Sequence, residues 1–458
     1  EHEHRVPLRS AATLAIRGAL STDRLQCVAP KGFVSFPRPT AKGKDLIAAK
    51  TAAAAQATTT EAETSRAARR ERHMAPEKER KTINEAFDSI CDFEELYAAY
   101  RDARKQKRYR RDVMEYAEQL EANLITTQNE LIWGTYEVGP YRPFYVTIPK
   151  LRLVMALQFR DRVVQHALYR RMNPFYDKLF IEDSYACRIG KGSHKAADRL
   201  QYWMRQVSRK PGAPWYYLKL DISKYFYRVN HRTLLDILKT RITDERLLRL
   251  LEIIVNSEDT AFGLPAGMGP EECPEELWLT DVGMPIGNLT SQLFANIYLN
   301  EMDQYAKHQM RIHYYIRYMD DIIILHQDKE ELANFRDEIA DFLRDNLQLD
   351  LNKKTAIRPV ALGVDFVGYR IYATHRKLKK STAYRIMHRI KTLSAQLAAG
   401  EITREEFDRV AASYKGVMSH CNSYGLRQKL NKTYKEAMGR LQDAHGAAAQ
   451  PDPERRRQ

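Results

Sequence analysis

The sequence predicts an α+β protein in which helices pack on one side of a small antiparallel sheet. Apolar residues recur at helical spacing from Ile83 onward, and a strong helical pattern covers residues 290–308. Short aliphatic and aromatic runs over 215–221 and within 312–326 are the best strand candidates. This mixture, without an internal repeat, is typical of the α+β class. The length of 458 residues allows two or three subdomains around a sizeable core.

The composition changes at about residue 73. Ala and Thr dominate residues 48–68, which contain no aromatic or large apolar residue and cannot form a core. Residues 1–73 carry 13 basic and 7 acidic residues, and we expect them to form a disordered basic extension. Met74 is then a candidate for the natural start, or for the point where folding begins. A dispensable basic arm and a transit peptide are the alternatives for this segment.

The chain from residue 74 to residue 214 is expected to begin with helices and continue into a β region. The predicted elements are, in chain order, helices over 83–100 and 111–131, a strand over 145–148, a hairpin turn over 149–152 and a helix over 159–172. The run 101–111 contains seven Lys or Arg residues. It predicts either a solvated helix face or a stripe that contacts a nucleic acid backbone.

The second half of the chain combines short strands with helices. Asn230 is a good N-cap for a helix that ends near Lys239. The later predicted elements are a loop or insertion over 258–282, a hairpin over 312–326, a helix over 329–346, short strands after 356 and helices over 382–442. The tail is polar from His445, so residues 446–458 are expected to be disordered.

The balance of charge indicates a polyanionic partner. The 74 Lys and Arg residues outnumber 59 Asp and Glu residues, which gives a net charge of +15 and a pI of about 9.4. Nucleic acid is the simplest such partner, and a basic but soluble surface is the alternative. The mean hydropathy of -0.56 and the shortness of aliphatic runs such as Ile322–Leu325 argue against an integral membrane protein.

The cysteines predict neither a zinc site nor a disulfide framework. None of the five forms a C-x2-C pair; they are Cys27, Cys91, Cys187, Cys273 and Cys421. Their odd number and wide spacing fit a reducing cytoplasm, and no signal-peptide pattern is visible. We therefore expect a cytoplasmic protein with inert thiols.

Three acidic residues carry the strongest chemical signal. Asp320 and Asp321 stand between two strand-forming runs, where paired carboxylates repel each other and resist desolvation. An exposed turn with solvated acids is the alternative for this pair. Asp221 ends the apolar strand over 215–221, and it converges on Asp320 if that strand lies beside the hairpin. Two Mg²⁺ ions held by shared carboxylates are typical of phosphoryl transfer, with the Ile222 carbonyl as a further oxygen ligand.

The order of the motifs resembles that of reverse transcriptases. Asp221 in its strand is similar to motif A, residues 283–292 (GMPIGNLTSQ) to motif B, and residues 318–321 (YMDD) to motif C. The resemblance covers about residues 80–445. It implies an RNA-directed DNA polymerase, a nucleotidyltransferase, with a right-hand fold and a small antiparallel palm sheet. The implied domains are N-terminal helices and fingers at 74–214, a palm with part of the fingers at 215–370, and a helical thumb at 371–445.

This resemblance also assigns roles to single residues. It implies that Asp221, Asp320 and Asp321 are catalytic and, with Ile222, hold two Mg²⁺ ions, Mn²⁺ being possible. Arg188 is the best candidate for contact with the incoming triphosphate, because a guanidinium group makes bidentate contacts with phosphate oxygens. Lys150 and Arg152, in the hairpin, are the next candidates.

Two further residues of the family motifs have open alternatives. Phe226 matches a steric gate against the ribose 2′-hydroxyl, unless it is only a core aromatic. Lys354 would protonate the departing pyrophosphate, or would only attract phosphate. Residues 364–369 resemble a primer grip, and the bases of the C-terminal helices resemble a thumb that holds a template–product duplex.

Motif B suggests a subfamily. Ile286, Gly287 and Gln292 fit the [IVL]-G-x-x-x-S-Q form of diversity-generating retroelements, where many reverse transcriptases have Gln before the glycine. A branched aliphatic side chain cannot supply the hydrogen bonds of Gln beside the nascent base pair, which would reduce discrimination. The alternative is that Ile286 only packs the palm.

Membership of this subfamily would define the substrates and partners. The enzyme would use dNTPs to copy a template-repeat RNA into cDNA with errors at adenines, in a bacterial or phage-encoded system without a membrane. It would act with an accessory helical-bundle oligomer. The alternatives are another bacterial reverse transcriptase (retron, group II intron-like or defence-associated), an RNA-dependent RNA polymerase, and a catalytically idle nucleic-acid-binding scaffold.

Overall fold

A computed structural model describes residues 82–146, 152–256, 261–265, 268–270, 272–353 and 355–448. Two predicted site residues, Lys150 and Lys354, lie outside the described residues, as do the whole predicted extension over 1–73 and the end of the chain from residue 449.

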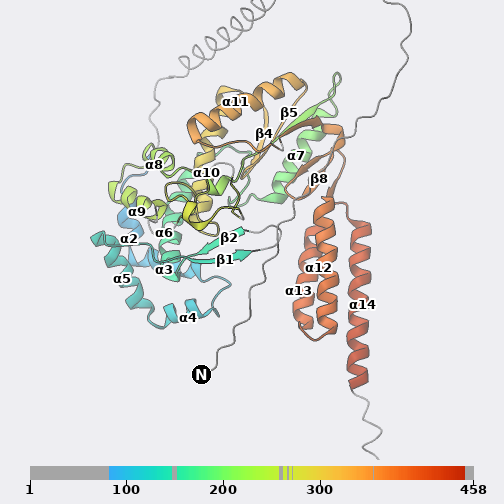
Figure 1. The fold of residues 1–458 in the computed structure, drawn as a ribbon, viewed down its shortest axis with the longest axis horizontal. Helices are drawn as coiled ribbons and strands as arrows, with labels where there is room; N and C mark the ends of the chain where they lie inside the picture. The colour runs from blue at the N-terminus through green and yellow to red at the C-terminus, as the bar shows by residue number, and fades with distance from the viewer. Residues whose placement is uncertain are drawn as a thin grey trace, which may run out of the picture. The chain divides into compact units, whose positions relative to one another are not determined.

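The centre of the fold is a four-stranded antiparallel sheet (Figure 1). Its strand order is β4-β5-β3-β6, with bounds Tyr314–Tyr318, Asp321–His326, Tyr216–Asp221 and Ala356–Pro359 respectively. The strands β3 and β5 pair in a register that sets Asp221 opposite Asp321. The predicted strand over 215–221 and hairpin over 312–326 are therefore confirmed, and so is the small antiparallel sheet.

Both faces of this sheet are covered, so the prediction of helices on one side only is wrong. Leu218, Leu220, Ile322 and Ile324 belong to a large core with α6 (Phe159–Tyr176), α10 (Leu289–Gln304) and α11 (Lys329–Leu347). The alternate residues of the same strands pack against α7 (Ser193–Val207) and a second small sheet. In Figure 1, β4 and β5 accordingly lie between α10 and α11 on one side and α7 on the other. The reason is visible in β5, where Ile322–Leu325 is apolar without alternation, as is typical of strands buried on both faces.

The N-terminal helices pack against α6 and lead to a hairpin. They are α2 (Ala86–Cys91), α3 (Phe93–Ala103), α4 (Arg111–Glu118) and α5 (Leu120–Trp133). The helix predicted over 111–131 is thus two helices, because the backbone of Gln119 leaves the helical region (φ -122°, ψ 45°). Strand β1 (Arg142–Val146) pairs with β2 (Arg152–Ala156), and it overlaps the predicted strand over 145–148 at residues 145–146. The rest of that strand and residues 149–151 of the predicted turn lie outside the described residues.

Between the sheet strands the chain forms three further helices. Asn230 caps α8 (His231–Lys239) as predicted, since its side-chain oxygen accepts the Thr233 N–H at 2.9 Å. The helix α9 (Glu245–Asn256) follows, in a segment for which no element is predicted. The helix predicted over 290–308 is α10 followed by a π-helical turn, Tyr305–Gln309.

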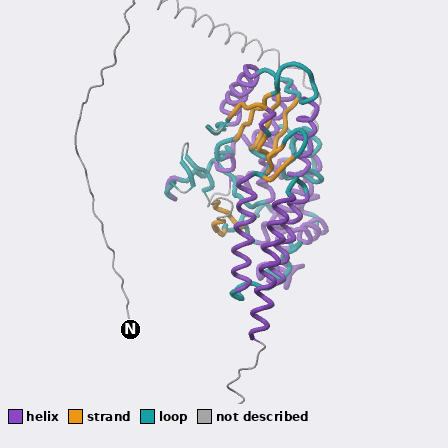
Figure 2. Tube along the Cα trace, turned by 90° about the vertical axis from the view of Figure 1, so that its right-hand side faces the viewer, coloured by secondary structure: helices purple, strands orange, loops and turns teal. Residues whose placement is uncertain are grey.

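The C-terminal part begins with a three-stranded antiparallel sheet, β7 (Val364–Phe366), β8 (Tyr369–Ile371) and β9 (Arg376–Leu378). Three helices follow as predicted, α12 (Lys380–Ala398), α13 (Arg404–Ser419) and α14 (Tyr424–Ala448), and they lie side by side (Figures 1 and 2). The last helix includes residues 446–448, and the rest of the predicted tail lies outside the described residues.

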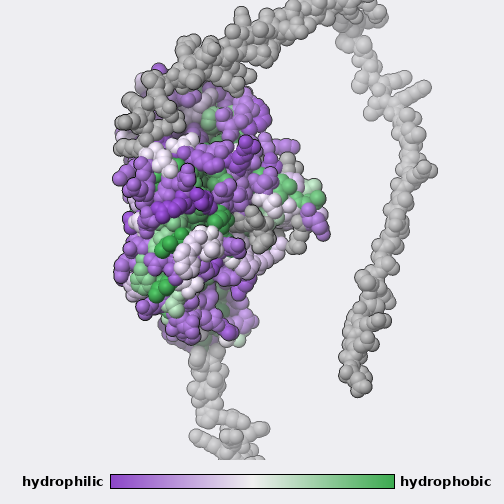
Figure 3. Space-filling view, turned by 90° about the vertical axis from the view of Figure 1, so that its left-hand side faces the viewer, coloured by the Kyte–Doolittle hydropathy of each residue, from purple (hydrophilic) through white to green (hydrophobic). Residues whose placement is uncertain are grey.

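One face of the molecule shows how polar and apolar side chains are distributed on its surface. The face in Figure 3 is largely hydrophilic with smaller hydrophobic patches. Within the described residues, no helix is both long and apolar enough to cross a membrane. The four described cysteines are free thiols, and Cys187 among them is exposed.

We predict that Asn230→Ala destabilises the protein by about 1 kcal/mol, because the first turn of α8 loses a side-chain acceptor. Denaturant unfolding monitored by circular dichroism measures this change. Asn230→Ser keeps an acceptor and serves as the control, so equal losses for the two variants would contradict a capping role.

Candidate active site

Three acidic residues lie at one end of the β3–β5 pair. Asp221 is the last residue of β3, Asp321 is the first residue of β5, and the two are direct partners in the ladder. Asp320 lies in the turn between β4 and β5, and its carbonyl accepts the backbone N–H of Ile222 at 3.3 Å. Met319, in the same turn, has a left-handed backbone with φ 56°. The fold thus brings together the acids that the sequence places 99 and 100 residues apart.

Two of these acids have polar partners that the sequence does not reveal. The Lys219 ammonium lies 2.7 Å from Asp321 Oδ1 and 2.8 Å from Oδ2, and it also donates to the Asp365 carbonyl at 2.9 Å. The Asn352 side chain donates to Asp221 Oδ2 at 3.0 Å, and its backbone N–H donates to the Asp221 carbonyl at 2.7 Å.

The pKa of Asp321 reflects both its burial and its acidic neighbours. Burial raises the pKa of Asp321 to about 6, and the negative charges of Asp221 and Asp320 add to that rise. The Lys219 ammonium opposes the rise without cancelling it. A bound cation would relieve the same repulsion.

The chemistry of the site fits a hard divalent cation. All candidate donors are oxygens, from Asp221, Asp320, Asp321 and the Ile222 carbonyl, which suits Mg²⁺ or Mn²⁺. Among the described residues, no group of three or more His, Cys, Asp or Glu side chains forms a ready-made metal cluster. Since Mg²⁺ keeps several waters, one or two carboxylates suffice to hold it.

The motif B loop packs against the hairpin β1–β2. The Met155 N–H donates to the Ile286 carbonyl at 3.3 Å, and the Ile286 side chain is half-buried. Gly287 has φ 115°, and a Cβ there would lie 3.0 Å from a methyl of Val154. A larger residue at 287 would therefore be strained and crowded. Gln292 is half-buried in the first turn of α10.

Phe226 lies in a short 3-10 turn just after β3. Its carbonyl accepts the Met284 N–H at 2.7 Å, so this turn is tied to the motif B loop. The Phe226 ring is only partly buried, whereas its neighbour Tyr225 is buried and donates its hydroxyl to the Ala295 carbonyl at 2.6 Å. Of the two, Phe226 keeps an accessible ring.

The two described arginines that are predicted to hold the triphosphate differ in exposure. Arg152, the first residue of β2, is exposed. The Arg188 side chain is only 6% exposed: its Nε donates to Asp177 Oδ1 at 2.6 Å, and its other nitrogens donate to the carbonyls of Asp177, Ile181 and Ser184. In this structure Arg188 therefore braces its own loop, and contact with triphosphate stays a prediction.

Two important residues, Lys219 and Arg317, are absent from the predicted site. Lys219 precedes Asp221 by two positions, so the alternation of a strand places both side chains on one face. Arg317 is a charged residue within an otherwise aromatic and aliphatic strand, a pattern that indicates a buried ion pair. Both signals are present in the sequence.

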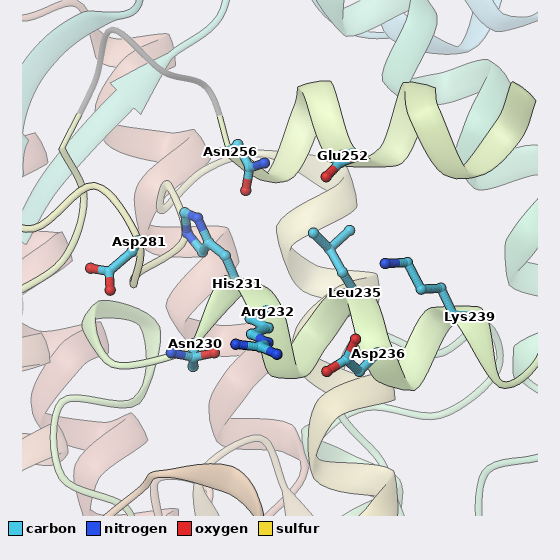
Figure 4. Close-up of a pocket in the computed structure, with 9 residues that line it drawn as sticks. All are labelled: Asn230, His231, Arg232, Leu235, Asp236, Lys239, Glu252, Asn256 and Asp281. Carbon is cyan, nitrogen blue, oxygen red and sulfur yellow. The ribbon is translucent and has the colours of Figure 1, made fainter. Parts of the chain in front are cut away.

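A pocket lies beside α8 and α9, and none of the three acids lines it. It has a volume of about 540 Å³ and is lined by residues of α8, α9 and the segment before Gly283 (Figure 4). His231 is buried beside it, and a ring nitrogen (Nε2) is 2.6 Å from the Gly283 carbonyl. Burial lowers the pKa of His231, so the neutral ring that supports Gly283 is favoured.

Comparison with known proteins identifies the class. Residues 147–371 match the family described as reverse transcriptase (RNA-dependent DNA polymerase). Protein YkfC of Escherichia coli (strain K12) is 27% identical over 314 residues, which cover 61% of this chain and 77% of that protein. The group II intron-encoded protein LtrA of Lactococcus lactis subsp. cremoris is 26% identical over 179 residues, covering 38% of this chain and 26% of LtrA.

Two more distant similarities were found. The putative COX1/OXI3 intron 2 protein of Saccharomyces cerevisiae is 22% identical over 316 residues, which cover 55% of this chain and 33% of that protein. The structure of apo telomerase from Candida tropicalis aligns with a TM-score of 0.39 and 13% identity, over 68% of this chain and 59% of that one. The chain thus spans about three quarters of YkfC but only a third or less of LtrA and the yeast protein.

The fold is that of a right-hand polymerase, and the enzyme class is nucleotidyltransferase. More particularly, the chain carries a reverse transcriptase domain, an RNA-directed DNA polymerase that would bind template RNA and dNTPs. Its relatives include bacterial and group II intron-encoded proteins.

We predict that Arg188→Lys lowers the free energy of unfolding by about 1–3 kcal/mol, because it removes buried hydrogen bonds to a charged donor. The KM for dNTPs should stay unchanged if the guanidinium only braces the loop. Steady-state kinetics and thermal unfolding of the same preparations measure both quantities.

The control is Arg336→Lys, which alters an ion pair with Asp337 on the surface of α11. That variant should change stability by less than about 1 kcal/mol. An increase in KM for Arg188→Lys at unchanged stability would instead assign Arg188 to the triphosphate.

Proposed function

We propose that this enzyme makes error-prone cDNA from a template-repeat RNA in a diversity-generating retroelement. The observation that carries the proposal is the motif B sequence from Ile286 to Gln292. This segment leads into α10, and the carboxylates lie at one end of the β3–β5 pair. The aliphatic residue before Gly287 is the feature that favours this subfamily over other reverse transcriptases.

In the proposed mechanism, Asp221 and Asp320 are the principal carboxylate ligands, with Asp321 and the Ile222 carbonyl beside them. Two Mg²⁺ ions bound there would activate the attacking 3′ oxygen and neutralise the charge on the leaving pyrophosphate. Mn²⁺ could take the place of Mg²⁺. Lys219 holds Asp321 in place at the ladder position opposite Asp221. Asn352 holds the carboxylate of Asp221 by its amide hydrogen bond.

Substrate selection is proposed for residues around this edge of the sheet. The accessible ring of Phe226 would exclude the 2′-hydroxyl of a ribonucleotide, and Arg152 would face the triphosphate. Lys150 and Lys354 keep their proposed contacts with phosphate. Arg188 would reach the triphosphate only by leaving its partners Asp177, Ile181 and Ser184, and the KM of Arg188→Lys tests this. The bases of α12 are proposed to hold the template–product duplex, because they form a charged stretch on a helix of the thumb.

Ile286 is proposed to reduce fidelity. Its side chain is half-buried and its carbonyl is tied to Met155 in the hairpin, so a branched aliphatic group is held at a defined place near the motif A and B turns. Such a side chain offers the nascent base pair no hydrogen bond, and discrimination then rests on shape alone.

We further propose that the enzyme acts with an accessory helical-bundle oligomer in the cytoplasm of a bacterium. The basic segment over residues 101–111 is a candidate contact for that partner or for the RNA. The alternative is a retron, group II intron-like or defence-associated reverse transcriptase. Errors that are not concentrated at template adenines would favour this alternative.

We predict that Asp320→Ala lowers cDNA synthesis by roughly 10³-fold or more, because a metal ligand that contributes several kcal/mol is lost. Primer extension on an RNA template with dNTPs and Mg²⁺ measures the rate. Asp345→Ala, which removes an exposed acid of α11, is the control and should behave as the parent. Synthesis by Asp320→Ala at the parent rate would overturn the metal assignment.

We predict that Ile286→Gln reduces misincorporation opposite template adenines by about 2–10-fold, the value of one net hydrogen bond to the nascent pair. Sequencing of cDNA made from a defined RNA measures the error spectrum. Ile286→Val keeps a branched aliphatic side chain and should leave the spectrum unchanged. Equal spectra for all three proteins would remove Ile286 from any role in fidelity.

A further inference from the structure

An arginine lies entirely inside the palm, directly before the turn that carries Asp320. Arg317 is in β4, and its side chain and that of Asp303 in α10 are both 0% exposed. Burying two charges costs free energy that their attraction repays only with good geometry, so a buried pair is not by itself a gain in stability. The contacts of the guanidinium group therefore need a different explanation.

Most of the guanidinium group is fixed by a single carboxylate. The Nε of Arg317 lies 2.8 Å and 2.9 Å from the two oxygens of Asp303, and Nη2 lies 2.6 Å from Asp303 Oδ2. The Tyr315 hydroxyl donates to the same carboxylate at 2.7 Å. This forked arrangement allows one orientation of the planar group.

The remaining nitrogen points to the active-site turn. Nη1 donates to the Met319 carbonyl at 3.2 Å and to Asn296 Oδ1 at 3.3 Å. Met319 has φ 56°, a backbone conformation that costs a non-glycine residue roughly 1–2 kcal/mol. The Met319 carbonyl belongs to the peptide that leads directly into Asp320. Its hydrogen bond with Arg317 therefore favours the unusual turn over an extended alternative.

The same network extends to two other parts of the site. Asn296 and Asp303 both belong to α10, which begins with the motif B residues. The Asn296 side chain donates to the Ala186 carbonyl at 2.9 Å, and the Arg317 backbone exchanges hydrogen bonds with Asp183 and Tyr185. One buried cation thus joins the catalytic turn, the motif B helix and the loop that contains Arg188.

We propose that Arg317 is a positioning residue for catalysis: it holds the Met319–Asp320 peptide so that the Asp320 carboxylate faces Asp221. This inference rests on the proposed function, because it takes Asp320 to be a metal ligand. It assigns the buried pair to the geometry of the metal site rather than to the stability of the palm.

The test compares variants that separate these two roles. Arg317→Lys keeps a positive charge for Asp303 but lacks the fork that reaches the Met319 carbonyl. A triple variant, Asp303→Leu with Tyr315→Phe and Arg317→Met, replaces the buried polar group by apolar side chains and can retain stability. Tyr315→Phe alone is the matched control, because it alters the Asp303 contacts and leaves the hydrogen bond to Met319 in place.

Three quantities are measured for each protein: the thermal midpoint, kcat and KM for dNTP on a primed RNA, and Mn²⁺ affinity from the electron paramagnetic resonance of free Mn²⁺. Asp320→Ala identifies the part of Mn²⁺ binding that belongs to the site. We expect Arg317→Lys and the folded triple variant to lose roughly 10–100-fold in Mn²⁺ affinity or kcat with unchanged KM, as for other residues that orient metal ligands. Tyr315→Phe should match the parent in kcat and Mn²⁺ affinity but melt at a lower temperature, because the buried Asp303 carboxylate loses one hydrogen bond.

The inference would be overturned if Arg317→Lys had the same kcat and Mn²⁺ affinity as the parent. It would also be overturned if the triple variant matched the parent in kcat, Mn²⁺ affinity and thermal midpoint. If the triple variant does not fold, Arg317→Lys alone decides. A parent protein that binds Mn²⁺ but makes no DNA would contradict the proposed function only, since the Mn²⁺ comparison still tests the role of Arg317.

Discussion

The antiparallel pairing of β3 with β5 is the constraint on which the candidate active site depends. Side chains alternate between the two faces of a strand, so a shift of one residue would move Asp221 and Lys219 to the opposite face from Asp321. The register is fixed by the core, because Leu218, Leu220, Ile322 and Ile324 must all enter the same apolar cluster. Hydrophobic burial thus determines the positions of the acidic residues. The free energy gained by packing the sheet offsets the repulsion between their like charges.

The polar groups around the acids reduce that cost. Lys219 forms an ion pair with Asp321, Asn352 donates to the Asp221 carboxylate, and Arg317 donates to the Met319 carbonyl in the turn that contains Asp320. Each of the three carboxylate residues therefore has its own protein support. Such support lets the oxygens keep their arrangement while substrate and product exchange, which is what preorganised electrostatic catalysis requires.

The motifs predict the palm well because they are local. An apolar run that ends in an acid, and two acids between aliphatic runs, define β3 and the β4–β5 turn without knowledge of the remaining chain. The helix α9 is also local, and its apolar residues recur at helical spacing, although no element is predicted over 245–256. The site beyond the acids is different. Lys219 meets Asp321 across 102 residues and Asp365 across 146, distances along the chain that only the tertiary fold resolves.

The error about the sheet faces and the unexpected burial of Arg188 have a common physical origin. A strand whose residues are all apolar fits burial on both faces of the sheet. The sequence does not show which segment covers the second face, and in the structure this segment is α7. Likewise Arg188 stands near glycines, a pattern that predicts a phosphate contact. In the folded chain its guanidinium group binds the Asp177 carboxylate and three backbone carbonyls instead. Charge alone does not decide between an internal and an external partner.

The helices α12–α14 hold two small cores of their own, separate from the two clusters that enclose the palm sheet. One is centred on Ile390 and Met418, and the other on Leu397 and Phe407. Breathing of this bundle would expose those apolar residues and leave the carboxylate edge packed. With the proposed duplex-holding role of these helices, a substitution in their cores would alter how long the enzyme stays on its template without altering the carboxylate site, so processivity and catalytic competence could vary independently in evolution.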